Sequence, residues 1–533
     1  MTPVNEAGFA KVEITAFERG MGLLGWGRDG NVALSVAEPL FARAMIVRSR
    51  ASGARIAYAC ADLCFISAAL RQRVIDLLAL EHAPLGLGPH EVMLTATHTH
   101  SGPSGFSHAF FYDLAGPGFA PRVFERLARG LASAIAEAAA AAEPAILSLG
   151  SARVPTAEPI AFNRSLDAFH RNREVRGSIG ADRALDRELL VLAAHDRRGR
   201  ALGALSLFAL HATSVHGDQQ ALHSDHKGLA AHELERLAIA RGASDRFVAI
   251  AGQGAAGDAS PTYRFDPRRG VTVGRFDDDA DSAAYVARVQ AAASASVLAE
   301  LPARGVILEG PIRGAVRHAD MERAGPARLG VSMAEGTAEG PGPLAALAPL
   351  LRMAPRARAA DPKITLLDVG PARRARLFGS MDPLALPLAH PAIAHARRAR
   401  REGGGLDTLP WIPTVLPLAI LQIGAFAIVG LPNEPTTMAG RRLRRAMEEA
   451  LAPLGVSRVH VSGYANAYAG YLTTLEEYGA QRYEGAYTLF GAGSLGVFEH
   501  ELRQLAAALP APHALGPPLQ LCTEAELSAR TRW

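Results

Sequence analysis

The sequence of 533 residues predicts an α/β fold. Apolar runs of strand length alternate along it with amphipathic runs of helical length, which is the pattern of this class. Hydrophobic residues make up 49% and charged residues 20%, as in an ordinary globular protein. A chain this long buries a sizeable core without disulfides. The composition therefore excludes a disordered tail, a collagen-like fibre and a small disulfide scaffold.

The elements of the N-terminal part follow from the spacing of apolar residues. The runs 41–50 and 54–66 predict strands, and 67–82 predicts a helix with Leu70, Val74 and Leu77 on one face. We expect 92–100 to be a strand that ends in histidines and 124–143 to be an amphipathic helix. The further elements expected are strands at 188–196, 201–213 and 246–254, and helices at 228–241 and 283–301.

The C-terminal part is less regular. Residues 311–362 are rich in Gly, Pro and Arg, and they predict no defined element. The uncharged run 408–433 is long enough to cross a bilayer, but its prolines and glycines divide it into short pieces. We expect it to form buried strands, with two strands over 415–432 meeting near Gly424. A helix is expected over 436–454.

Charge and cysteine content exclude several functions. The net charge is +4, and the basic stretches at 397–401 and 441–445 carry no interleaved aromatic residues, which excludes nucleic acid as a partner.

Three cysteines give no disulfide framework, and Cys60 and Cys64 are expected to be small buried hydrophobic residues. The first 20 residues lack an apolar signal segment, so we expect a cytoplasmic protein.

The strongest local motif is His98-Thr-His100, which ends an expected strand and precedes a Ser-Gly-Pro turn. Side chains two residues apart on a strand point to the same side, so one imidazole can bind a metal while the other moves protons. An isolated motif of this kind is a weak signal. Its position at a strand end, where α/β folds place their sites, favours function.

Other motifs each allow two interpretations. His211 also ends an expected strand, whereas His216, His223 and His226 are interpreted as a polar surface loop. Ser260 in a tight turn is a nucleophile or a turn residue. The pattern Gly20-x-Gly22-x-x-Gly25 lacks the strand–turn–helix unit of a dinucleotide site, and we reject that function.

The C-terminal part holds further candidates. Glu434 is a metal ligand or a charge placed favourably near a helix N-terminus. The segment 464–487 holds six of the ten tyrosines together with several carboxylates, and it serves packing or lines a site.

Taken together and in order, these segments resemble the neutral/alkaline ceramidase family, the non-lysosomal ceramide amidohydrolases. The matching motifs run through nearly the whole chain to about residue 498. They lie at 96–103, 163–165, 211–214, 225–228, 257–261, 336–342, 434–443 and 476–485.

The resemblance implies one large α/β catalytic domain over 1–510, with mixed β-sheets flanked by helices, and a C-terminal extension over 511–533. The immunoglobulin-like domain that family members commonly carry is expected to be lacking. The resemblance also implies a Zn²⁺ ion, and its ligands fall by motif on His98, His211, Glu434 and Tyr471.

The remaining site residues come from the same resemblance. His100 is the catalytic neighbour of the metal, and Arg164 and Tyr483 fall where the family contacts the scissile amide. Ser260 falls on the serine long assigned as the nucleophile, and we favour a positioning role for it. Pro435 and Thr262 depart from the family pattern beside these residues, so the pocket is expected to be reshaped.

The function expected is cleavage of the amide of ceramide or a related N-acyl lipid by a metal-activated water. One alternative is a biosynthetic enzyme of the same fold that forms amides, cyclises or transfers acyl groups. Another is an inactive lipid-binding homologue. The expected partner is a small N-acyl lipid or amide, with homo-oligomer formation left open and no transmembrane segment.

Overall fold

The computed structural model describes most of the chain. The described residues are 5–27, 30–114, 118–175, 180–342, 344–353, 361–370, 375–383, 385, 394, 397, 401, 411–511, 516–523 and 526–527. Arg398 and Arg400 of the basic stretch at 397–401 lie outside them, as do parts of the expected extension 511–533.

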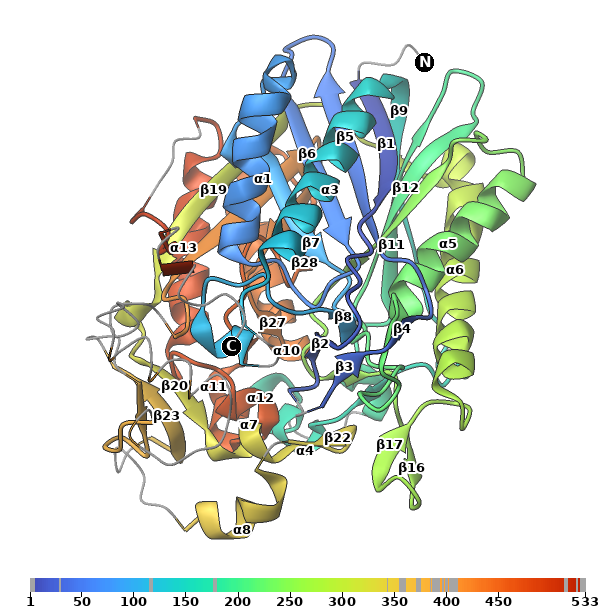
Figure 1. The fold of residues 1–533 in the computed structure, drawn as a ribbon. Helices are drawn as coiled ribbons and strands as arrows, with labels where there is room; N and C mark the ends of the chain where they lie inside the picture. The colour runs from blue at the N-terminus through green and yellow to red at the C-terminus, as the bar shows by residue number, and fades with distance from the viewer. Residues whose placement is uncertain are drawn as a thin grey trace.

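The largest element is a mixed sheet of nine strands (Figure 1). Two neighbouring pairs, β12 with β14 and β6 with β7, are parallel, and the other pairs are antiparallel. In spatial order the strands are β14 (Val248–Gln253), β12 (Ala201–Phe208), β11 (Glu188–His195), β9 (Glu143–Arg153), β1 (Asn5–Glu13), β5 (Phe41–Ser49), β6 (Arg55–Ala61) and β7 (Val92–Ala96), with β18 (Val306–Ile307) also paired to β9.

A second sheet of four strands packs against this one, and a shared cluster of buried side chains fills the space between them. Its order is β19 (Ile312–Asp320), β25 (Val415–Ile423), β26 (Phe426–Gly430) and β28 (Arg458–Ser462). β25 and β26 turn at Gly424, whose φ of 54° suits glycine, as the sequence predicted.

Helices cover the outer faces of both sheets (Figure 1). The large sheet is covered by α1 (Ala68–Glu81), α3 (Pro121–Ala140), α5 (Asp225–Ala240) and α6 (Asp279–Arg304). The second sheet is covered by α10 (Thr437–Leu451) and α13 (Ser494–Ala508). The fold is therefore helix, sheet, sheet, helix, which confirms the predicted α/β class with mixed sheets flanked by helices.

Burial on both faces explains why the strands read as continuous apolar runs. In β6, Ala57 and Ala59 pack under the helices, whereas Tyr58 and Cys60 face the second sheet. The run 415–432 is likewise buried in β25 and β26. Among the described residues, no helix is long and apolar enough to cross a membrane.

Two predicted strands end earlier than expected. β7 ends at Ala96 and β12 at Phe208, so His98 and His211 lie in the loops that follow. His98 has a φ of 68°, which is incompatible with a strand. The segment 311–362, for which no element was predicted, contributes β19, β20 (Ala327–Gly330), α7 (Val331–Glu335) and α8 (Ala348–Leu351).

Candidate metal and active site

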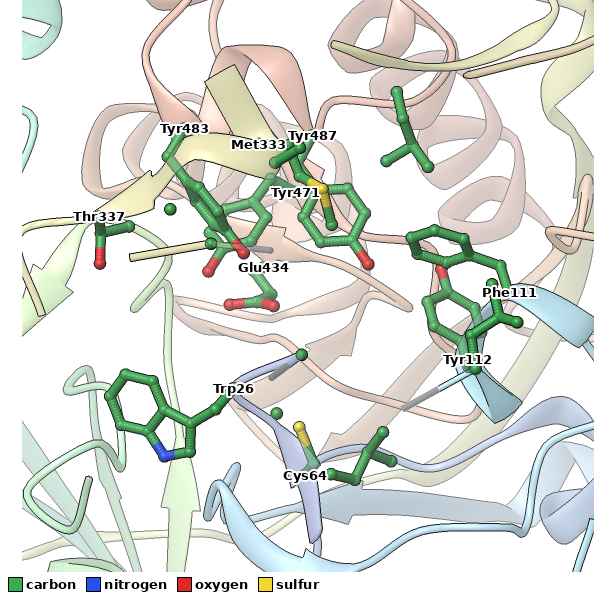
Figure 2. Close-up of a pocket in the computed structure, with 18 of the residues that line it drawn as sticks. Trp26, Cys64, Phe111, Tyr112, Met333, Thr337, Glu434, Tyr471, Tyr483 and Tyr487 are labelled. Atoms are coloured by element: carbon green, nitrogen blue, oxygen red, sulfur yellow. The ribbon is translucent and has the colours of Figure 1, made fainter. Parts of the chain in front are cut away.

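A pocket of about 560 Å³ opens beside the ends of the strands β6, β7 and β26. Most of its lining is aromatic or aliphatic, and the neighbouring side chains of His98, His100 and Glu434 form what we call its polar end. The segment 311–362, for which the sequence predicted no element, supplies part of the apolar wall through Leu329, Met333 and Leu344. Figure 2 shows Glu434 at the centre, with Tyr471 and Tyr483 on one side of it and Trp26 and Cys64 on the other.

His98 is fixed at the polar end by its backbone and by one ring nitrogen. It lies between β7 and β8 (Ser101–Pro103) in the left-handed region. Its Nδ1 donates to the carbonyl oxygen of Cys64 at 2.6 Å, so Nε2 keeps its lone pair and points to the site. Such a hydrogen bond is the usual support of a metal-binding imidazole.

His211 is held in the same way from the opposite side. Its Nδ1 lies 3.0 Å from the carbonyl oxygen of Ala256, and its Nε2 lies 3.0 Å from Nε2 of His98. Oε2 of Glu434 lies 3.2 Å from Nε2 of His98 and 3.4 Å from Nε2 of His211. Three buried donor atoms from distant segments therefore converge on one point.

Tyr471 approaches this point through backbone pairing. It lies opposite Glu434 in a short parallel pair formed by β27 (Glu434–Pro435) and β29 (Tyr471–Leu472). Its hydroxyl is 3.4 Å from Nε2 of His211 and accepts a hydrogen bond of 2.7 Å from Arg164. The structure therefore brings together all four residues predicted as ligands.

The electrostatics of this cluster favour a cation. Burial acts to lower the pKa of His98, but the carboxylate of Glu434 outweighs it and raises the pKa to about 10. Burial and the charge on His98 lower the pKa of His211 well below its usual value. Burial acts to raise the pKa of Glu434, but His98 lowers it to about 2. Positive charge is thus stabilised among these donors, and two imidazoles and a carboxylate are a donor set that suits Zn²⁺.

His100 lies beside the cluster. Its Nε2 is 3.1 Å from Nε2 of His98, and burial lowers its pKa well below the usual value, with the charges of His98 and Arg164 acting in the same direction. The predicted convergence of the two histidines is present, but its predicted cause is wrong. The residues are not alternate positions of a strand, because β7 ends at Ala96 and the turn at His98 aims the rings together.

Arg164 follows β10 (Phe162–Asn163) and is fully engaged with protein groups. It bonds Glu339, Glu484, the carbonyl oxygen of Gly257 and the Tyr471 hydroxyl. Its guanidinium also packs over the rings of Tyr471 and Tyr483, which meet edge to face at 5.4 Å. Arg164 therefore orients Tyr471, and all three residues line the pocket.

Ser260 lies behind the pocket wall. It belongs to β15 (Ala259–Ser260), which pairs with β10, and its side chain is completely buried. Its Oγ donates to Oε1 of Glu339 at 2.6 Å and lies 3.0 Å from Oγ1 of Thr262. Its hydrogen-bond partners in the described structure include no histidine.

One functional candidate, Glu339, was not singled out from the sequence, whereas Tyr464 and Tyr468 belong to the segment 464–487 that was expected to serve packing or line a site. Glu339 lines the pocket and accepts hydrogen bonds from Ser260, Thr213 and Arg164. The hydroxyls of Tyr464 and Tyr468 donate to the two oxygens of Glu434. The dense tyrosines of 464–487 were a usable signal, whereas Glu339 was covered only by the matching motif 336–342 and was given no role of its own.

One interpretation of individual residues needs correction, and the expectation that Cys60 and Cys64 are buried is confirmed. His216, His223 and His226 do not form a surface loop, because all three are buried and hydrogen-bonded. Cys60 is a buried residue of the core, as expected. Cys64 is buried as well, but it also lines the pocket, with its thiol 3.8 Å from Nδ1 of His98.

An apolar pocket that ends in buried imidazoles, a carboxylate and phenols defines an α/β enzyme with a metal-type centre and a mainly apolar substrate. Residues 6–348 and 400–500 match the family described as neutral/alkaline non-lysosomal ceramidase, N-terminal. The chain belongs to this family, which confirms the resemblance read from its motifs and makes it a hydrolase of the amidohydrolase type.

Individual relatives agree with this assignment. The neutral ceramidase of Pseudomonas aeruginosa is 31% identical over 528 residues, which cover 97% of this chain and 74% of that protein. Neutral ceramidase B of Dictyostelium discoideum is 27% identical and covers 93% and 71%. A solved ceramidase complexed with C2 superposes with a TM-score of 0.81 at 29% identity, over 98% of this chain and 78% of that one. The crystal structure of the Pseudomonas aeruginosa neutral ceramidase gives 0.77 at 28% identity, over 97% and 76%.

Proposed function

We propose that this protein is a zinc-dependent amidohydrolase that cleaves ceramide or a related N-acyl lipid into a fatty acid and an amine. The observation that carries the proposal is the convergence of Nε2 of His98, Nε2 of His211 and Oε2 of Glu434 at the polar end of an apolar pocket. These three residues and Tyr471 would hold the ion. Zinc supplies a Lewis acid that polarises a carbonyl and lowers the pKa of a bound water towards about 7.

The apolar wall, His100 and Tyr483 have separate roles around the amide in this proposal. The apolar wall holds the hydrocarbon and excludes bulk water, which strengthens every polar interaction at the reacting carbon. His100, neutral because burial lowers its pKa, takes the proton of the attacking water and delivers it to the amide nitrogen as the C–N bond breaks. Tyr483 is kept protonated by burial, which raises its pKa, and donates to the developing oxyanion.

Arg164 and Ser260 position other side chains in this account and do not react with the substrate. The hydrogen bonds of Arg164 to Glu339 and Glu484 fix the guanidinium that orients Tyr471. Ser260 supports the same network through Glu339. A nucleophilic serine needs a base within hydrogen-bond reach, and the group that Ser260 reaches is a carboxylate paired with Arg164.

The test is to measure bound zinc by elemental analysis and to follow N-acylsphingosine by mass spectrometry. We expect wild-type protein to bind zinc and release fatty acid, and His98→Ala to lose both properties. His232→Ala is the matched control, because that imidazole is 73% exposed and lies outside the site.

Two results would overturn the proposal. Condensation of fatty acid with the sphingoid base, without hydrolysis, would instead support the biosynthetic alternative. Binding of zinc and lipid with neither reaction would support an inactive lipid-binding homologue.

A further inference from the structure

We propose that Gly25 and Trp26 are positioning residues that fix the imidazole of His100 for proton transfer, an inference that rests on the proposed function. Gly25 is the last glycine of the rejected dinucleotide pattern and the last residue of β2 (Met21–Gly25), which pairs antiparallel with β8, and Trp26 follows it. Gly25 lies opposite Ser101 in this pair. The pairing brings the end of β2 directly against His100.

His100 differs from the other two histidines in how it is held. Nδ1 of His98 and Nδ1 of His211 each face a backbone carbonyl oxygen. Nδ1 of His100 is buried and has no hydrogen-bond partner in the described part of the chain. Apart from the contact of its Nε2 with Nε2 of His98 at 3.1 Å, its ring orientation depends on packing, and Gly25 and Trp26 provide two of the packing surfaces.

Gly25 leaves the space that the ring of His100 occupies. A Cβ atom at this position would lie 2.4 Å from Cγ of His100 and 2.8 Å from its Cα. Contacts this short are not tolerated, so any side chain here displaces the imidazole. Gly25 also has a φ of 134°, which other residues rarely adopt.

Trp26 closes another side of His100. The two rings meet edge to face, with centroids 5.1 Å apart and planes at 77°. This geometry places the polar edge of one ring on the electron-rich face of the other. Gly340 lies against the indole, and a Cβ there would lie 3.4 Å from the ring of Trp26.

Trp26 is itself held by a hydrogen bond and by ring stacking. Its Nε1 donates to the carbonyl oxygen of Val215 at 3.2 Å, and its ring stacks on His216 at 5.4 Å. Both ring nitrogens of His216 face acceptors, Asp279 at 3.1 Å and the carbonyl oxygen of Thr272 at 3.0 Å. Two acceptors favour the imidazolium form of His216: burial acts to lower its pKa, but Asp279 outweighs burial and raises it. A charge on this ring adds a cation–π attraction to the indole face.

The first test compares Gly25→Ala with Gly20→Ala. Gly20 also has a positive φ, 86°, but its Cβ would meet nothing within 4 Å, so the control carries backbone strain without the clash. We expect Gly25→Ala to keep its zinc and its KM within about threefold while kcat falls about 10- to 100-fold, because a misplaced proton carrier costs this much. Equal kcat in the two variants would overturn the inference.

The second test does not depend on the folding of Gly25→Ala. We expect Trp26→Ala to lower kcat about tenfold with zinc retained, and Trp26→Phe, which keeps an aromatic face, to restore most of it. Wild-type kcat in Trp26→Ala would contradict the proposal.

A crystal structure of Gly25→Ala distinguishes a failure of the positioning role from a failure of the proposed function. A displaced His100 ring in the variant, together with zinc-loaded wild-type protein that cleaves no N-acyl lipid, would refute the proposed function while leaving the packing relationship intact. An unmoved ring would refute the positioning role whatever the activity.

Discussion

The Nε2 atoms of His98 and His211 lie 3.0 Å apart, while Nδ1 of each ring faces a backbone carbonyl oxygen. The carbonyls require a proton on each Nδ1, which leaves the two Nε2 lone pairs directed at each other. Only a positive charge makes this arrangement favourable. Without a metal, a proton shared at this point supplies the charge, which is why the pKa of His98 is raised.

Zinc is expected to stabilise the fold as well as the site. A ligand that binds only the folded state raises the unfolding free energy by about 2.7 kcal/mol at 100 times its Kd. We expect chelation to lower the Tm of wild-type protein and added zinc to restore it. In Glu434→Gln the Tm should change much less in both experiments, which differential scanning fluorimetry measures. An equal response in the variant would place the zinc elsewhere.

Tyr468→Phe tests the support of the metal ligand. The change removes the hydrogen bond to Oε1 of Glu434 but keeps the ring, which stacks on Phe65 at 4.3 Å. Loss of such a supporting bond typically weakens metal binding about 10- to 100-fold, and competition with a chelator measures this. Tyr112→Phe, a change in a neighbouring tyrosine that contacts the same ring, is the control. Equal zinc affinities in the two variants would contradict the account.

Ser260→Ala separates positioning from nucleophilic catalysis. Glu339 still accepts from Thr213 and Arg164 in this variant, so we expect kcat to fall about tenfold while zinc is retained. Removing a true nucleophile costs about 10⁴-fold or more. A loss of that size, together with an acyl-enzyme trapped in wild-type protein by rapid quench and mass spectrometry, would restore the nucleophile assignment.

Lys227 makes stability depend on pH. Its Nζ donates to the carbonyl oxygens of Phe208 and Gly252, and burial lowers its pKa to about 7, against an ordinary value of 10.5. Between these values the unfolded chain binds more protons than the folded one, so this lysine makes the free energy of unfolding rise with pH. Each unit of pKa difference contributes about 1.4 kcal/mol.

Urea denaturation at pH 6.5, 8 and 9.5 checks this prediction. The difference in unfolding free energy between wild type and Lys227→Met should shift in favour of wild type as the pH rises. Lys11→Met is the control, because Lys11 is partly exposed and pairs with Glu235. A pH-independent difference for Lys227→Met would show that the buried amine keeps its ordinary pKa.

Much of the fold could be predicted from the sequence because buried apolar residues recur along the chain with the period of the helix to which they belong or form runs of strand length. The helix at α1 begins and ends within a residue of the predicted range 67–82, and β25 and β26 turn at the predicted Gly424. The packing of the two sheets on each other could not be predicted. Strands buried on both faces carry no alternation that tells which neighbour each face meets.

The site was predictable where a motif carried it and not where tertiary contacts did. The spacing of His98 and His100 predicted that their side chains lie together. The turn that brings the two rings together depends on the left-handed φ of His98, which the sequence does not reveal. Glu339 reaches Arg164 and Ser260 only through the fold. Gly25 belongs to a sequence pattern that is typical of another function, and its missing Cβ matters only because His100 lies against it in the fold.

The most direct test of the metal centre is a zinc-soaked crystal measured on both sides of the zinc absorption edge. The account predicts one anomalous peak about 2.0 to 2.1 Å from Nε2 of His98 and Nε2 of His211, with an oxygen of Glu434 completing the contact. Full zinc occupancy at any other place, with these two imidazoles still facing each other unbridged, would contradict it.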